Sequence, residues 1–219
     1  MASHPAPRPR LPHHIALELK RHAPFTLVGA LTGILIAVLL VRTGAPRALS
    51  QRLFWTLHPL HVLLSALTTA AMYRLKSRNP RIWSVVLIGY VGSIGIATLS
   101  DSLIPYLGEW LLHLPNRGIH LGFIEKYWLV NPLALLGIAL TYVRATTSIP
   151  HAGHVLLSTW ASLFHMTMAL EGGLSVATGV LVVLFLFAAV WVPCCTSDIV
   201  FPLLFTSGRT AQRPVVESG

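Results

Sequence analysis

Long apolar stretches alternate with short polar connections along almost the whole chain, and this pattern predicts transmembrane helices. A helix that crosses the hydrocarbon layer of a bilayer needs about 20 mainly apolar residues. Six segments meet this requirement, and they are residues 23–42, 53–73, 82–108, 127–143, 151–170 and 174–205. The hydropathy pattern therefore predicts an all-α integral membrane protein that crosses the membrane six times.

Polar, Pro-rich segments flank this apolar region at both ends of the chain. They include HPAPRPRLPHH near the N-terminus and GRTAQRPVVESG at the C-terminus. Because such composition cannot bury enough apolar surface to form a core, we expect residues 1–12 and 207–219 to be poorly ordered tails. The chain leaves no room for a second, soluble domain.

A short string recurs in the two halves of the chain. HPLHVLLS at 58–65 returns as HAGHVLLS at 151–158, with six identities in eight positions. A match of this length at equivalent places in two sets of apolar segments indicates an internal repeat.

A second motif follows each copy in the same order. Ser-Asp-x-x-x-Pro begins at Ser100 in the first half and at Ser197 in the second. We therefore interpret the chain as a duplication, with one three-helix repeat at 13–112, an outer linker at 113–119 and a second three-helix repeat at 120–206.

An odd number of spans in each half means that the second copy enters the membrane from the opposite side. Inverted repeats of this kind are typical of secondary transporters, whose paired broken helices place the substrate near the middle of the bilayer. The third segments, 82–112 and 174–206, are longer than one span needs and contain a Pro beside the Ser-Asp pair. Because Pro removes a backbone hydrogen bond, we expect the third helix of each repeat to be discontinuous there.

Composition agrees with a membrane protein, and charge fixes an orientation. The chain is 54% hydrophobic and 11% charged, with a mean hydropathy of +0.68. Its net charge of +9 is spread over the connections, which argues against a nucleic-acid partner. With the N-terminus inside, eleven of the 16 Lys and Arg face the cytoplasm, so the positive-inside rule predicts a multi-pass protein with both termini cytoplasmic.

Repeated ionisable residues inside the apolar segments indicate a metal site. Two His three positions apart share one helix face, and a buried Asp is costly unless it has a partner. Two His and one Asp per half suit a divalent transition-metal ion such as Mn, Fe, Co, Ni or Zn. The predicted ligands are His58, His61, Asp101, His151, His154 and Asp198.

Further polar residues could complete such a site. Ser100 and Ser197 stand at the expected helix breaks, and Cys194 and Cys195 precede the second Ser-Asp pair without a counterpart in the first half. His165 has no repeat partner and is expected to be an ordinary hydrogen-bonded His. The first His/Asp set falls toward the outer side and the second toward the inner side, so one shared site and two separate sites both remain open.

The outer connection between the repeats carries a polar group of its own. Glu109, His113, His120 and Glu125 fall in LGEWLLHLPNRGIHLGFIEK. Polar residues are usual in loops, so the pattern does not distinguish capture of a cation from an ordinary solvated connection.

The leading functional hypothesis is a permease for a divalent metal cation, embedded in the lipid bilayer and small enough that a homodimer is compatible with it. The first alternative is a membrane-embedded metalloenzyme whose His and Asp side chains activate water or oxygen. The second is a non-catalytic membrane subunit or assembly factor, in which the His residues only hydrogen-bond to the Asp residues. The sequence contains no phosphate-binding loop, dinucleotide fingerprint, Gly-x-Ser-x-Gly or His-Glu-x-x-His, which argues against nucleotide-driven transport and standard hydrolases.

Overall fold

The computed structural model shows an all-helical bundle in the part of the chain that it describes, which comprises residues 24, 27–36, 38–40, 42–44, 46–143, 148–170 and 176–206. The elements from residue 46 onward are α2 (Arg47–Lys76), α3 (Ile82–Thr98), a π-helical turn (Leu99–Leu103), α4 (Ile104–Leu111), α5 (Gly122–Glu125), α6 (Tyr127–Val143), α7 (Ser148–Ala169) and α8 (Val176–Leu204). Helical residues between 27 and 40 precede them.

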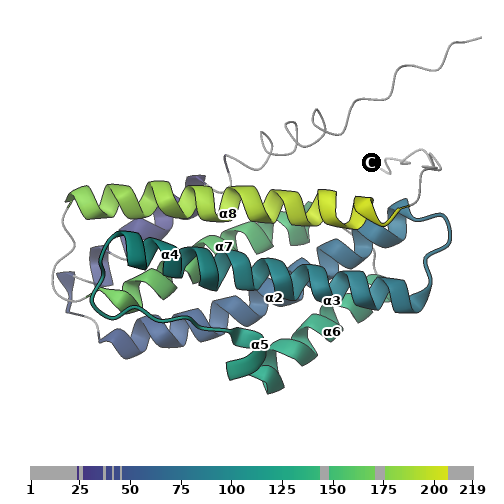
Figure 1. The fold of residues 1–219 in the computed structure, drawn as a ribbon, viewed down its shortest axis with the longest axis horizontal. Coiled ribbons are helices and arrows are strands. Elements are labelled where there is room, and N and C mark those ends of the chain that lie inside the picture. The colour runs from purple at the N-terminus through teal and green to yellow at the C-terminus, as the bar shows by residue number, and fades with distance from the viewer. Residues whose placement is uncertain are drawn as a thin grey trace, which may run out of the picture.

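The helix α2 lies at the centre of the bundle. It packs against α7 over much of its length, and α6, α3 and α8 also contact it. The helices α3 and α4 continue each other as one rod, and α8 runs along that rod (Figure 1). The helices α2 and α7, which carry the two copies of the repeated string, are therefore in direct contact.

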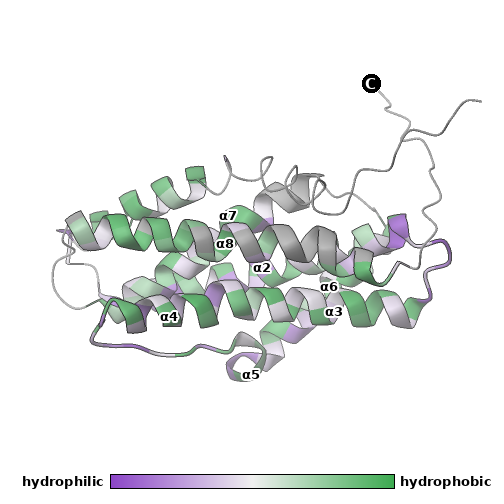
Figure 2. Ribbon diagram, turned by 45° about the horizontal axis from the view of Figure 1, so that its top comes forward, coloured by the Kyte–Doolittle hydropathy of each residue, from purple (hydrophilic) through white to green (hydrophobic). Residues whose placement is uncertain are grey.

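Apolar side chains face outward over much of the described bundle. Figure 2 shows hydrophobic residues along the helices and hydrophilic ones mainly in the connections. Inside, by contrast, many fully buried side chains are polar, among them His58, His61, Ser93, Asp101 and Glu109. Large apolar residues are exposed on several helices, including Leu87, Leu107, Leu136, Leu181 and Leu184. An apolar exterior around polar side chains is the arrangement that a lipid environment favours.

Two described helical segments are long and apolar enough to cross a membrane, by length and composition. They are Arg47–Lys76 and the rod Ile82–Leu111, each of 30 residues. Shorter apolar helices lie at Leu27–Leu40, Tyr127–Val143 and Ala177–Trp191. The helices thus coincide with the predicted apolar segments, whereas six membrane crossings and the two inverted repeats stay predictions.

The expectation of a discontinuous third helix is wrong for the first half. The backbone stays in the right-handed helical region from Thr98 through Ile104, and the helix widens into a π turn around Asp101 instead of unwinding. In the second half, α8 is also one helix, with Pro193 and Pro202 inside it. The physical reason in the first half is that side chains of α7 satisfy the carbonyl groups that the π turn and Pro105 leave unpaired.

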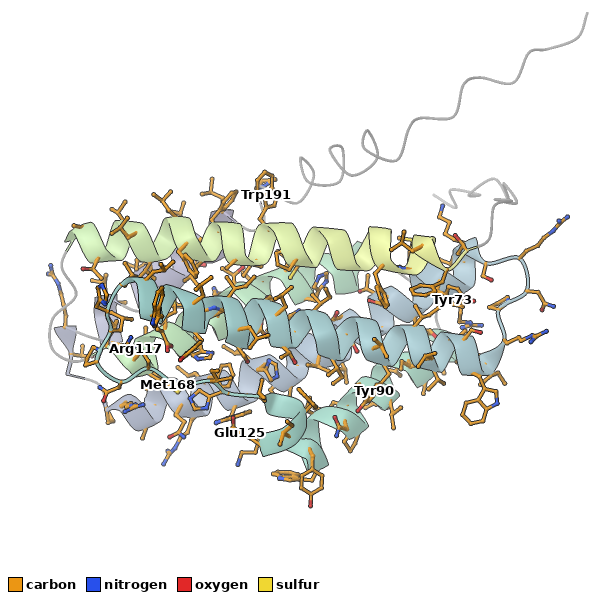
Figure 3. All side chains as sticks on the ribbon, in the orientation of Figure 1. Tyr73, Tyr90, Arg117, Glu125, Met168 and Trp191 are labelled. Carbon is orange, nitrogen blue, oxygen red and sulfur yellow. The ribbon has the colours of Figure 1, made fainter. Side chains whose placement is uncertain are left out.

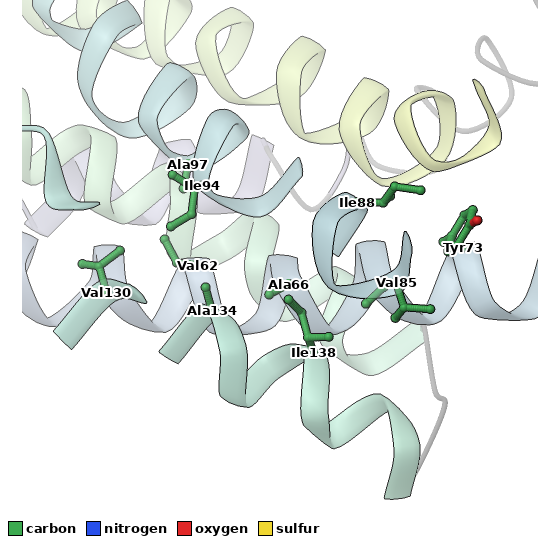
Figure 4. Close-up of a cluster of buried hydrophobic side chains, with 11 residues drawn as sticks. Val62, Ala66, Tyr73, Val85, Ile88, Ile94, Ala97, Val130, Ala134 and Ile138 are labelled. Atoms are coloured by element: carbon green, nitrogen blue, oxygen red, sulfur yellow. The ribbon is translucent and has the colours of Figure 1, made fainter. Parts of the chain in front are cut away.

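A compact apolar cluster joins α2, α3 and α6. Val62 and Ala66 of α2 meet Val85 of α3 and Ile138 of α6 in this cluster (Figure 4). Small residues bring the helix backbones together here, because Gly137 of α6 lies directly against the main chain of α2. The cluster fixes α3 relative to α2 and so positions the π turn that follows α3.

Substituting Ala for Gly137 is expected to destabilise the protein by about 2 to 3 kcal/mol, the usual cost of overpacking. The new Cβ would lie 2.3 Å from the main-chain oxygen of Leu63, which cannot rotate away. Equilibrium unfolding in detergent measures the effect. Gly95→Ala is the matched control, since a Cβ at Gly95 meets no atom within 4 Å, and Ala is the better helix former by about 1 kcal/mol. Equal stability of the two variants would contradict the packing.

Candidate metal centre

The π turn presents Asp101 to the interior because its backbone bonding is shifted by one residue. The N–H of Ile104 donates to the oxygen of Leu99 instead of that of Ser100. The hydroxyl of Ser162, on α7, donates to the Ser100 oxygen at 2.9 Å and so occupies the acceptor that the shift exposes. Turns of π helix are frequent at functional sites.

Pro105 leaves a second carbonyl group to be satisfied. Pro has no N–H to donate to the oxygen four residues earlier, which is the oxygen of Asp101. His165 of α7 lies with its Nδ1 2.7 Å from that oxygen. Side chains of α7 thus take over two helical hydrogen-bond acceptors, which explains why the chain can stay helical around the Ser-Asp pair. His165 is a hydrogen-bonded interior His, as the sequence indicated.

The Asp101 carboxylate is fully buried and accepts hydrogen bonds from four side chains. Its Oδ2 lies 2.9 Å from His58 Nδ1 and 2.7 Å from His61 Nδ1. Its Oδ1 accepts the hydroxyl protons of Ser100 and Ser158, each at 2.7 Å. Because a carboxylate only accepts, both His residues donate from Nδ1. The structure therefore brings together the first predicted set, His58, His61 and Asp101. We call Asp101 with its four hydrogen-bond donors the Asp101 hub; the donors are His58, His61, Ser100 and Ser158.

His61 and His154, the second His of each repeated string, meet across the α2–α7 interface. Their rings stack with centroids 5.7 Å apart and planes 9° from parallel. Of the two arrangements that the sequence left open, the structure thus shows convergence for this pair. His61 keeps Nε2 buried and without a hydrogen-bond partner, while its Nδ1 is held by Asp101.

Cys194 of α8 completes a group of three potential ligands. Among the side chains that the structure describes, His61, His154 and Cys194 offer ligand atoms that all lie within 4.8 Å of one another, and all three residues are buried. Ligand atoms around a tetrahedral Zn²⁺ are on the order of 3.5 Å apart, given metal–ligand distances of about 2.0 to 2.3 Å. Side-chain shifts of about 1 Å would bring the three ligand atoms to the separations that a tetrahedral ion requires.

The Asp101 hub also reaches Cys194. The thiol of Cys194 donates to the Ser158 hydroxyl at 3.5 Å, and Ser158 in turn donates to Asp101. One carboxylate therefore holds His61 directly and Cys194 through one hydroxyl. A ligating His normally donates its other ring nitrogen to a carboxylate, which orients the ring and raises its basicity, and His61 has this arrangement.

His58 belongs to the hub but not to the three-ligand group. Its ring stacks on Phe54 with centroids 5.3 Å apart, and a Cβ added to Gly122 would lie 2.3 Å from its Nε2. The Nε2 of His58 is thus covered by α5, away from the group formed by His61 and its neighbours. His58 and His61 were predicted to bind one ion together. In the structure both donate to Asp101, but the Nε2 of His58 faces Gly122, whereas His61 lies beside His154 and Cys194.

The remaining predicted ligands lie outside the side chains that the structure describes. These are His151, Cys195, Ser197 and Asp198.

Sequence reasoning missed the roles of Ser158, Ser162 and Glu109. Ser158 ends the repeated HVLLS string, so the repeat itself was the signal that could have identified it. Glu109, which the sequence placed in the outer connection, is 1% exposed at the end of α4 and faces His165 at 3.4 Å. In that connection, His120 and Glu125 lie 3.4 Å apart and are partly exposed.

No family model matches this chain, and neither a curated protein nor a solved structure is significantly similar to it.

Proposed function

We propose that this protein is a membrane permease for a divalent transition-metal ion, with Zn²⁺ as the preferred cargo, and that His61, His154 and Cys194 bind the ion. The supporting observation is the convergence of these three buried side chains from both halves of the chain. Asp101 acts in this proposal as a positioning residue, because its carboxylate is already occupied by four hydrogen-bond donors.

The donor set narrows the choice of metal. Imidazole and thiolate ligands suit Zn²⁺ and copper, whereas Mg²⁺, Ca²⁺ and Mn²⁺ prefer oxygen ligands. Charge favours a divalent ion further, because two neutral imidazoles, the Cys194 thiolate, the Asp101 carboxylate and one M²⁺ sum to zero. A neutral assembly is the one that a buried site accommodates at least cost. A proton leaves the Cys194 thiol when the ion binds.

The position of the group supports transport. Its ligands come from α2 in the first half and from α7 and α8 in the second. Rocking of one repeat against the other would open such an interface site alternately to the two sides, as in transporters with inverted repeats. The proposal therefore includes six spans in two inverted repeats with both termini in the cytoplasm.

Exposed aromatic residues support this topology. Trp83 and Trp110 are exposed near the two ends of the rod Ile82–Leu111, and Tyr127 and Trp128 are exposed at the start of α6. Aromatic side chains are enriched at both membrane–water interfaces. A rod with Trp near both ends fits a segment that crosses the bilayer.

Zinc binding and zinc uptake by the full-length protein test the proposal. We expect purified protein to bind Zn²⁺ in competition with a chelator of known affinity, and proteoliposomes to take up radioactive zinc faster than protein-free vesicles. A His61→Ala/His154→Ala double variant is the negative control for both measurements. Wild-type protein that retains no more zinc than this variant would refute the metal site.

A membrane-embedded metalloenzyme is the second candidate, and one observation favours it. Three protein ligands leave a fourth tetrahedral position open, which is the arrangement of catalytic zinc sites. Tight zinc binding without uptake into proteoliposomes, together with hydrolytic activity that the double variant lacks, would favour the enzyme over the permease.

A further inference from the structure

Both ring nitrogens of His165 face main-chain oxygens. Nδ1 lies 2.7 Å from the oxygen of Asp101, and Nε2 lies 2.8 Å from the oxygen of Gly118. A carbonyl oxygen can only accept a hydrogen bond, and a neutral imidazole has only one N–H. The doubly protonated ring is the form that satisfies both contacts.

Glu109 supplies the matching negative charge. Its Oε1 lies 3.4 Å from His165 Nε2, and both side chains are 1% exposed. Its Oε2 accepts the N–H of Gly118 at 3.1 Å. A buried charge is tolerated when a partner and hydrogen bonds compensate its desolvation, and the Glu109 carboxylate can be such a partner for a doubly protonated His165.

The groups around this pair connect it to one end of the bundle. The connection 112–121 turns at that end and runs back along the bundle to α5 (Figure 1). In this connection, the centroid of the His120 ring lies 5.1 Å from that of the His165 ring. The positive charges of Arg117, in the same connection, and of Arg47, on α2, attract the Glu109 carboxylate. Figure 3 places Arg117 at the end of the bundle opposite Tyr73.

The pair is also linked to the proposed metal centre through a single residue. The main-chain oxygen of Asp101 faces His165, and the carboxylate of the same residue holds His61. A divalent cation that enters next to Asp101 would repel the nearby imidazolium through the low-dielectric interior. The two positive charges are therefore expected to exclude each other.

We propose that the Glu109–His165 pair is a proton-binding site that exchanges its proton for the metal ion, an inference that rests on the proposed function. When the cation enters, the Nε2 proton of His165 moves to Glu109 Oε1, which leaves a neutral imidazole and a carboxylic acid. The acid then gives this proton to water at the end of the bundle closed by the connection 112–121. Once Nε2 has lost its proton, it no longer donates to Gly118, so the connection loses one of its attachments.

Zinc and proton movements in the same proteoliposomes test the exchange. With a zinc gradient and a pH-sensitive dye in the lumen, we expect wild-type protein to move protons against the direction of zinc. Glu109→Gln is expected to keep zinc binding in detergent and to lower the number of protons moved per zinc ion, because only the Cys194 proton then leaves when the ion binds. Glu125→Gln, which removes a partly exposed carboxylate of the same region, is expected to behave like the wild type.

The outcomes separate this inference from the proposed function. Wild-type protein that does not bind zinc would refute the metal site itself, and the exchange with it. Zinc transport without proton movement, or unchanged proton movement in Glu109→Gln, would refute the exchange alone.

A measurement that needs neither zinc nor transport tests the charge of the pair. Nitrogen NMR of the ¹⁵N-His-labelled full-length protein, with the His165 signal assigned by its loss in His165→Gln, is expected to show two protonated ring nitrogens. A neutral ring at His165 would overturn the proposal even if Glu109→Gln failed to fold.

Discussion

His154→Ala is expected to weaken zinc binding by at least about 100-fold, because it removes one of the three proposed metal ligands, and loss of an outer-shell partner alone costs about 10- to 100-fold. The His154 side chain is buried, and its ligand atom lies within 4.8 Å of those of His61 and Cys194. Chelator competition with purified protein measures the change. The fold should tolerate the substitution better than it tolerates loss of Asp101, because His154 is not the acceptor at the centre of the hub.

His113→Asn is the control for this variant. His113 is an exposed His of the connection 112–121 with a φ of 52°, a conformation that Asn also adopts readily. It should bind zinc like the wild type. Equal zinc affinity of His154→Ala and His113→Asn would exclude His154 as a ligand and with it the three-ligand centre.

Asp101→Ala is expected to lower the free energy of unfolding by about 3 to 5 kcal/mol, the usual cost of breaking a buried charged network. The substitution leaves two imidazole N–H groups and two hydroxyls buried without their acceptor. Each such unsatisfied group costs about 1 to 3 kcal/mol before the surroundings relax. Equilibrium unfolding in detergent measures the loss.

The same variant distinguishes positioning from ligation. Folded Asp101→Ala should retain zinc binding that is weakened by about 10- to 100-fold, as for loss of an outer-shell carboxylate. Ser93→Ala is the stability control, because Ser93 is a buried residue of α3 whose hydroxyl donates to the main-chain oxygen of Tyr90 on the same helix, and it should cost about 1 kcal/mol or less. Equal destabilisation by the two variants would contradict the role of Asp101 as a hub.

The approximate positions of the helices could be read from the sequence because apolar residues occupy the exposed as well as many of the buried positions of the helices, so that long apolar runs remain visible. The segments predicted at 53–73 and 82–108 lie inside the described helices Arg47–Lys76 and Ile82–Leu111. The repeated His-x-x-His strings also indicated where polar chemistry would gather, and the first predicted set does meet, at Asp101.

The sequence could not show which His residue is a proposed metal ligand and which one only donates to Asp101. The two His of one string share a helix face, and they differ only in the residues that pack against them in the tertiary structure. His58 is covered by Gly122 of α5, which is distant in the sequence, whereas His61 faces His154 of α7. The buried position of Glu109 was hidden for the same reason, because its partners Gly118 and His165 come together only when the connection folds back onto α7.

Hydropathy and internal repetition, which depend on residue order alone, determined that this protein is helical and where its costly polar residues lie. The tertiary structure decided how those residues are satisfied. Pro105 removes a helical donor, and the sequence predicted a broken helix from this loss; the packing of α7 instead supplies His165 and Ser162 as replacement donors. Whether an unpaired backbone group breaks a helix depends on what lies beside it in space, and that information is absent from the order of residues along one segment.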